Sequence, residues 1–198
     1  MQDSFKTIAK TISGALFKEK GSKFIGYAFP VTDETKINAY LEAVKKEHHK
    51  ARHWCYAWRL GHPDEHYRIN DDGEPSGTAG LPIYGQIQSF ELTDVLVVVV
   101  RYFGGTKLGV SGLINAYKTV AKDILSQANI IEKTLDKTIS LTFEYADMDK
   151  VLRLLRQHNA NIITQELAMN CNFKVSIRKS HSEQLTKAIK DLRCVIIK

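Results

Sequence analysis

Residues 94–109 read DVLVVVVRYFGGTKLG, and this stretch decides the fold. The run from Val95 to Val100 is apolar without alternation, which predicts a strand buried on both faces, as at the centre of a sheet. The predicted strand covers residues 94–103, and Gly104-Gly105 ends it. Apolar residues then recur at helical spacing from Leu113 to Ile124, which predicts a long amphipathic helix over residues 110–127.

The segments before this strand also show clear patterns. Residues 4–13 and 14–20 alternate and predict an opening hairpin turned near Ser13-Gly14, and residues 23–31 predict another strand. A helix follows, because Ile37, Leu41 and Val44 share one face and Thr32 or Asp33 can cap it. Residues 53–60 and 66–69 are predicted strands joined by a turn at 61–64, and residues 82–90 are a predicted short helix.

The last third of the chain shows a simple element order. Strands are predicted at residues 137–144, 160–166, 172–178 and 194–197; one helix is expected after Asp147 and another after a capping box of Ser180 and Glu183. The order βαββαβ is typical of a ferredoxin-like domain. Residues 129–136 form the expected boundary, so the sequence predicts an α+β protein with domains at residues 1–134 and 135–198.

Composition narrows the class of protein. The 198 residues carry a net charge of +6, and residues 135–198 are the more basic part, with 11 Lys and Arg against 7 Asp and Glu, compared with 17 against 15 before them. Positive charge favours a polyanionic partner such as RNA, although solubility explains it equally well, and no feature is specific to DNA. The cysteines Cys55, Cys171 and Cys194 have no CxxC spacing, which suits a reducing cytoplasm. No apolar run is long enough to predict a signal peptide or a membrane span.

The glycine-rich junction after the central strand is the first candidate site. Backbone N–H groups at the start of a helix favour an anion, and glycines let it approach closely. The residues that would form such an anion or nucleic-acid site are Arg101, Gly104, Gly105, Thr106, Lys107, Gly109 and Ser111. The GxxxxGK[ST] order of a P-loop is missing. An equal alternative is that the glycines only permit a tight strand-to-helix turn.

The acidic loop over residues 70–80, NDDGEPSGTAG, is the second candidate. Asp71, Asp72 and Glu74 offer oxygen ligands of the kind that Mg²⁺ or Ca²⁺ prefers. Ser76 and Thr78 are possible nucleophiles if a base lies within hydrogen-bond reach. We favour a third interpretation, a turn-rich loop whose side chains bond their own backbone, and we expect neither a metal nor a cofactor.

Two basic segments complete the candidates. Residues 48–59 mix cations such as Arg52 with aromatic residues, which suits contact with nucleic acid, but the alternating Trp54, Tyr56 and Trp58 more often pack in a core. The spacing gives weak support to a Cys–His pair of His53 and Cys55, and to a zinc site built on His49, His53 and Cys55. In the C-terminal domain, Lys150, Arg153 and Arg156 share the outer face of a helix, where they either contact RNA or are merely solvated.

Four motifs together resemble the IMPACT/YigZ family, over roughly residues 15–130. They are Lys23-Phe24-Ile25-Gly26, the run from Ala51 to Ala57, the loop from Asn70 to Gly80, and the run from Val100 to Gly109. The resemblance implies a ribosomal protein S5 domain 2-like fold for the first domain, as in domain IV of elongation factor G. It implies an elongation factor G domain V-like, ferredoxin-like fold for the second. No set of catalytic residues comes with the resemblance.

The resemblance also directs the functional expectation. The eukaryotic relative, IMPACT, competes for the activator of a translation-initiation kinase, but its partner-binding extension is not found in this sequence, so we do not expect that role to transfer. We expect a non-enzymatic, translation-linked regulator that binds RNA or the ribosome. The alternatives are a small-molecule or hydrolytic enzyme that uses the acidic loop and the glycine turn, and a module that binds another protein.

Overall fold

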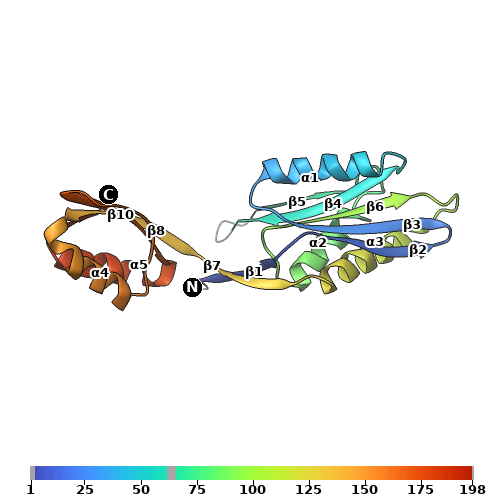
Figure 1. Cartoon of the computed structure of the whole chain (residues 1–198). Coiled ribbons are helices and arrows are strands. Elements are labelled where there is room, and N and C mark those ends of the chain that lie inside the picture. Colours follow the sequence, from blue (N-terminus) through green and yellow to red (C-terminus); the bar gives the residue numbers. More distant parts are fainter. Residues whose placement is uncertain (1–2, 62–65, 198) are drawn as a thin grey trace. The chain divides into compact units, whose positions relative to one another are not determined.

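The computed structural model describes residues 3–61 and 66–197 (Figure 1). The chain forms two compact units, which are considered separately. The N-terminal unit comprises residues 5–133, and the C-terminal unit comprises residues 1–4 together with residues 134–198. Each unit contains helices packed on a sheet, so the predicted two-domain α+β architecture is confirmed.

A five-stranded antiparallel sheet organises the N-terminal unit. Its strands lie in the order β2 (Ile12–Glu19), β3 (Ser22–Pro30), β6 (Val95–Tyr102), β4 (His53–Leu60) and β5 (His66–Asn70). Helix α1 (Glu34–Glu47) covers one face, and α2 (Gly80–Ser89) and α3 (Gly109–Ser126) cover the other (Figure 1). Among the described residues, no helix is long and apolar enough to cross a membrane.

The central strand β6 explains why its sequence lacks alternation. Val95, Val97 and Val99 pack into the cluster formed with α2 and α3. The intervening side chains, Leu96, Val98 and Val100, pack into the cluster beneath α1. All six are fully buried, so the prediction of a strand buried on both faces is confirmed.

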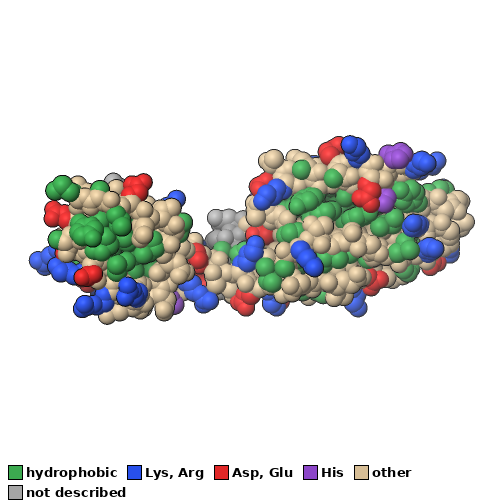
Figure 2. All heavy atoms as spheres, in the orientation of Figure 1, with side chains coloured by type: hydrophobic (Ala, Val, Ile, Leu, Met, Phe, Trp, Pro, Cys, Tyr) green, Lys and Arg blue, Asp and Glu red, His purple; other side chains and the backbone are tan. Residues whose placement is uncertain are grey.

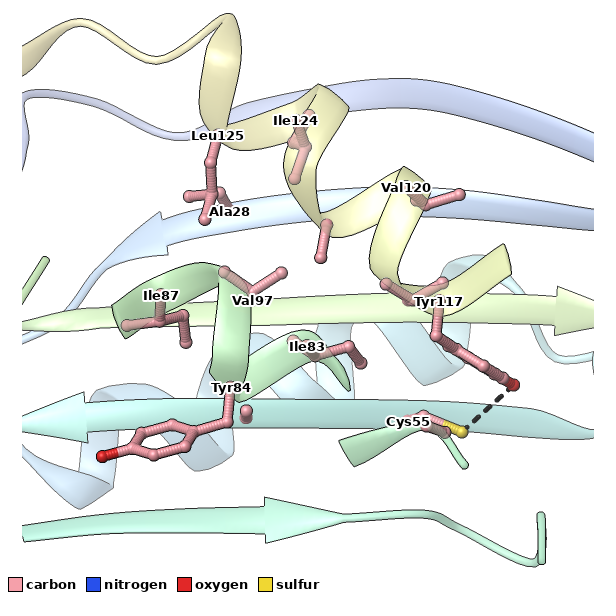
Figure 3. Packing of buried hydrophobic residues seen from close by; sticks show 14 of the residues in the cluster. Ala28, Cys55, Ile83, Tyr84, Ile87, Val97, Tyr117, Val120, Ile124 and Leu125 are labelled. Carbon is pink, nitrogen blue, oxygen red and sulfur yellow. Dashed lines mark hydrogen bonds between the residues drawn. The ribbon is translucent and has the colours of Figure 1, made fainter. Parts of the chain in front are cut away.

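Helix α3 fits closely onto the sheet. Val120, Ile124 and Leu125 point from the helix toward β3 and β6, and Tyr117 reaches toward Cys55 of β4 (Figure 3). A Cβ added at Gly26 of β3 would lie 2.7 Å from a methyl group of Val120. A side chain at that position would therefore push the helix away from the sheet.

The predicted opening hairpin is wrong. Strand β1 (Ser4–Ile8) pairs with β7 (Ile130–Thr134), which lies within the segment expected to be only a boundary. Gly14 has a φ of 104° and sits at a register shift inside β2, so it forms a bulge rather than a turn. The hairpin joins β2 to β3 through Lys20 and Gly21, and residues 62–64 of the other predicted turn lie outside the described residues.

The C-terminal unit has the element order βαββαβ. The elements are β8 (Asp136–Glu144), α4 (Met148–Gln157), β9 (Asn161–Glu166), β10 (Asn170–Arg178), α5 (Ser182–Asp191) and β11 (Val195–Ile197). The strands lie antiparallel in the order β11-β8-β10-β9. Side chains from both helices and from β8 and β10 share one core, so the helices cover the same face of the sheet.

The predicted helix caps in this unit are not formed. The Asp147 carboxylate accepts a hydrogen bond from Lys150 Nζ (2.8 Å) instead of from a helix amide. His181, and not Ser180, occupies the cap position of α5, and its side chain makes no capping bond. Asp147 occupies the N-cap position of α4, as predicted, but its side chain makes no capping bond. The 3-10 turn over Lys179–His181 moves the start of α5 past Ser180.

Candidate functional site

The acidic loop over residues 70–80 is folded around its own carboxylates. Asp71 Oδ1 accepts hydrogen bonds from the amides of Ala79 (2.9 Å) and Gly80 (2.8 Å), and its Oδ2 accepts from Gly77 (2.9 Å). Asp71 thereby caps α2 from eight residues away. Thr78 is buried and donates to the carbonyl of Pro75 (2.6 Å), while Ser76 is exposed.

The second carboxylate of the loop ties it to the sheet. Asp72 Oδ2 accepts from the amide of Trp54 at the start of β4 (2.7 Å), and the Asp72 carbonyl lies 2.9 Å from His53 Nδ1. Since Asp71 and Asp72 both accept backbone hydrogen bonds, they shape the loop. Among the described residues, no cluster of three or more His, Cys, Asp or Glu is arranged to hold a metal ion.

Glu74 points from this loop into the interior, where it meets Arg101. Arg101 Nη1 lies 2.7 Å from Glu74 Oε1, and the exposed fractions of the two side chains are 5% and 4%. The Tyr117 hydroxyl from α3 donates to the same oxygen (2.8 Å). The structure thus places an ion pair beneath the surface, between Glu74 of the loop and Arg101 of β6, and Tyr117 of α3 adds a hydrogen bond to it.

Arg101 is also held by an aromatic and hydroxyl cage. Its guanidinium carbon lies 5.4 Å from the ring centres of both Phe24 and Phe103, within the range of cation–π attraction. Its Nη2 donates to Ser22 Oγ (3.2 Å), which also accepts from the amide of Gly104 (3.2 Å). The Arg101 charge is therefore already matched inside the protein.

Cys55 and His53 flank this network. The Cys55 sulfur is fully buried, 3.2 Å from the Tyr117 hydroxyl and 3.0 Å from the carbonyl of Asp71. Burial raises the pKa of the thiol well above its usual range, so the thiol stays protonated and is a poor nucleophile. His53 Nε2 lies 4.0 Å from Glu74 Oε1, at the outer edge of the network.

Backbone geometry demands glycine in the turn after β6. A Cβ on Gly104 would lie 1.9 Å from the carbonyl carbon of Gly21 in the β2–β3 hairpin. Gly105 and Gly109 have φ values of 89° and 78°, which side-chain-bearing residues rarely adopt. Thr106, Lys107 and Ser111 are exposed around this turn.

The turn lies at a strongly basic end of the sheet, which we call the basic end. Strand register and the Gly21–Gly104 contact bring the β2–β3 hairpin beside it, and the Arg52 amide donates to the Arg101 carbonyl (3.3 Å). The basic end comprises the exposed side chains of Lys18, Lys20, Lys23, Arg52 and Lys107. None of the five has an ion-pair partner among the residues that the structure describes. Figure 2 shows several Lys and Arg side chains at this end of the unit, on the right.

The aromatic residues of β4 pack as the sequence predicted. Trp58 is buried in the cluster beneath α1, and Trp54 and Tyr56 lie partly buried against it.

On the same face of the sheet lies a chain of polar side chains that the sequence did not predict. His48 bridges the hydroxyls of Tyr27 and Tyr102, and Tyr27 donates to Glu47 (2.9 Å). Desolvation raises the pKa of Tyr27. Tyr27 and Tyr102 lie 21 and 54 residues from His48, and no motif connects them.

The cations predicted on the C-terminal domain form a separate group. Lys150, Arg153 and Arg156 are exposed on α4, and Lys150 pairs with Asp147. They belong to the C-terminal unit, whereas Arg52 and Lys107 belong to the N-terminal unit. The predicted anion-binding residues therefore fall into an α4 group, the basic end, and the buried Arg101.

Comparison with known proteins identifies the family of this chain. The sequence matches the Impact N-terminal domain over residues 20–125, a range that contains the Glu74–Arg101 network and the basic end apart from Lys18. The chain belongs to the IMPACT family. A second match, to a domain of unknown function (DUF1949), covers residues 141–192. The family resemblance predicted from the motifs is thus confirmed.

Relatives within the IMPACT family extend over both units. The IMPACT family member YvyE of Bacillus subtilis is 30% identical over 192 residues, covering 97% of this chain and 88% of the relative. YigZ of Escherichia coli is 36% identical over 149 residues, covering 74% and 73%. A crystal structure described as that of a hypothetical protein is 29% identical, with a TM-score of 0.74 over 100% of this chain and 97% of the other.

Proposed function

We propose that this protein is a non-enzymatic, cytoplasmic regulator linked to translation, and that it binds RNA or the ribosome through the basic end of its N-terminal unit. The observation that carries the proposal is the set of five exposed cations without ion-pair partners among the described residues, gathered around the glycine turn. The link to translation is the one that the resemblance to the IMPACT family implies.

Simple electrostatics supports a polyanion at this end. Cations that are not engaged in an ion pair attract phosphates, and the nucleic acid releases condensed counterions when they bind. Lys107 lies in the turn itself, where Gly105 and Gly109 leave the backbone uncovered by side chains. The nearby carboxylate of Glu74 is buried and paired with Arg101, so it does not oppose an incoming phosphate at the surface.

We also propose the fold relationships that the family resemblance implied. For the C-terminal unit, the βαββαβ order and the antiparallel strand order β11-β8-β10-β9 support a ferredoxin-like fold. For the N-terminal unit, we propose the ribosomal protein S5 domain 2-like fold. Lys150, Arg153 and Arg156 on α4 are a second proposed RNA-contacting group.

The hydrolytic alternative has weaker support from the same geometry. Both carboxylate oxygens of Asp71 and Oδ2 of Asp72 accept hydrogen bonds from backbone amides, so these two acids of the loop act in its folding. The Cys55 thiol is buried and protonated at neutral pH. A protein partner at the basic end remains the competing outcome of the binding experiment.

The proposal is tested by binding of the intact protein to mixed cellular RNA and to ribosomal subunits over a salt series. We expect affinity to fall steeply with salt, and Lys107→Gln to reduce the slope of log affinity against log salt by about 0.7, one phosphate contact. Lys122→Gln is the matched control, because Lys122 is exposed near the far end of the same helix α3. Absence of salt-sensitive binding, or equal effects of the two substitutions, would overturn the proposal.

A further inference from the structure

An aromatic side chain stands exposed at the centre of the basic end. Phe103 follows the last residue of β6, and 40% of its surface is accessible to solvent. Its ring centre lies 5.4 Å from the guanidinium carbon of the buried Arg101, and the ring centre of Phe24 lies at the same distance from that carbon. A large apolar ring is thus presented to solvent beside the glycine turn and five cations.

The arginine that supports this ring is held in place by its own polar contacts, and so is the backbone next to the ring. Arg101 is held by the carboxylate of Glu74 (2.7 Å) and by Ser22 Oγ (3.2 Å), and the amide of Gly104, the next residue, donates to the same Ser22 oxygen. The support under Phe103 is therefore a buried charge with its own counter-charge. A ring that is ordered before binding loses little conformational entropy when a ligand stacks on it.

We propose that Phe103 is a stacking platform for an unpaired base of single-stranded RNA whose phosphates contact the basic end. This inference rests on the proposed function and specifies its ligand. Unstacked bases present a planar face that pairs with an aromatic side chain, whereas the bases of a duplex are already stacked on one another. The combination of an aromatic platform and a cationic rim is the arrangement that binds single strands with little sequence preference.

Charge favours RNA over a protein segment as the occupant. Glu19, within the β2 strand, is the acidic side chain that adjoins the cations of the hairpin, and it is partly buried. A repeating anion with planar groups between its charges satisfies both the cations and the ring. An acidic peptide would satisfy the cations alone, so it serves as a competitor in the test.

The experiment compares two 12-nucleotide probes of equal charge, oligouridine and a fully abasic ribose-phosphate strand, by fluorescence anisotropy with the full chain. We expect the wild type to bind oligouridine about 5- to 150-fold more tightly than the abasic strand, the range for one stacked base. Phe103→Leu should remove that preference and leave both abasic binding and the salt slope unchanged. Phe103→Trp should retain the preference. Thermal unfolding of each variant verifies that the fold is intact.

The outcomes separate this inference from the proposed function. If the wild type binds neither probe at low salt, the RNA proposal itself fails. If it binds both probes equally, or binds a duplex as tightly as oligouridine, the platform is refuted while RNA binding stands. Displacement of oligouridine by polyglutamate at equal charge concentration would show a site that reads charge alone, and would likewise overturn the platform.

Discussion

Replacement of Glu74 by Gln tests the internal ion pair that supports the candidate site. The substitution keeps the size of the side chain and an amide oxygen that can accept from Tyr117, but it removes the negative charge 2.7 Å from Arg101. Arg101 is 4% exposed and is enclosed by Phe24, Ser22 and Phe103. Its guanidinium would then be a buried charge without a counter-charge.

The expected cost follows from that burial. Removing one partner of a buried ion pair destabilises a protein by about 3–5 kcal/mol, because the remaining charge cannot be resolvated. A domain has about 5–15 kcal/mol of total stability, so Glu74→Gln should remove a large part of it. If Arg101→Met accompanies Glu74→Gln, the buried charge is gone, and the double variant should be much more stable than the sum of the single effects predicts.

Urea denaturation followed by tryptophan fluorescence measures the free energy of unfolding of the N-terminal unit. The chain has two tryptophans, and Trp54 and Trp58 both lie on β4 of the N-terminal unit, so the signal reports that unit alone. The midpoint should fall in Glu74→Gln while the slope with urea stays constant. A loss below about 1 kcal/mol in the single variant, or simple additivity in the double variant, would contradict the argument from buried charge.

Two further predictions concern the turn and the thiol. Gly105→Ala should lower the free energy of unfolding by about 1–3 kcal/mol, because a φ of 89° strains any residue with a side chain although the space around it is open. Gly104→Ala should lower it more, because the added Cβ would lie 1.9 Å from the Gly21 backbone. Equal losses of stability in urea denaturation would refute this ranking. Burial raises the pKa of the Cys55 thiol in the folded protein, so as the pH rises the unfolded chain loses that proton first. The free energy of unfolding should therefore be unaffected below about pH 8.5 and then fall by up to about 1.4 kcal/mol per pH unit. Cys55→Ala should make that decline of stability with pH shallower. The pKa values of Tyr117 and Tyr27 are also raised, but these residues should contribute only above about pH 10. A slope unchanged by Cys55→Ala would contradict the assignment to this thiol.

The elements that could be predicted from the sequence are those whose signal is local. Strand β6 and helix α3 have strong periodicity, and their bounds differ from the prediction by one residue at each end. The opening hairpin could not be found this way, because the role of Gly14 depends on its register against β3, and because β1 pairs with a strand more than a hundred residues away. Long-range pairing leaves no trace in the periodicity of either strand.

In the candidate site, too, only the features with a local signal could be predicted from the sequence. The loop at residues 70–80 and the glycine turn stand out in the sequence through their composition, but the Glu74–Arg101 pair spans 27 residues and has no local signature. One available signal was that successive side chains of a strand such as β6 point to opposite faces of the sheet. Val95, Val97 and Val99 face α2 and α3, so position 101 continues the same inward face, and an arginine there requires a buried partner.

The buried arginine also gives the proposed RNA-binding surface a support whose charge is already compensated. The charge of Arg101 is paired with Glu74, so we infer that its planar guanidinium supports Phe103 instead of binding a phosphate. The outer cations remain free to contact phosphates, since the nearest buried carboxylate is already neutralised. Position 101, which the sequence suggested as an anion ligand, thus contributes to the proposed interface through the ring that it holds in place.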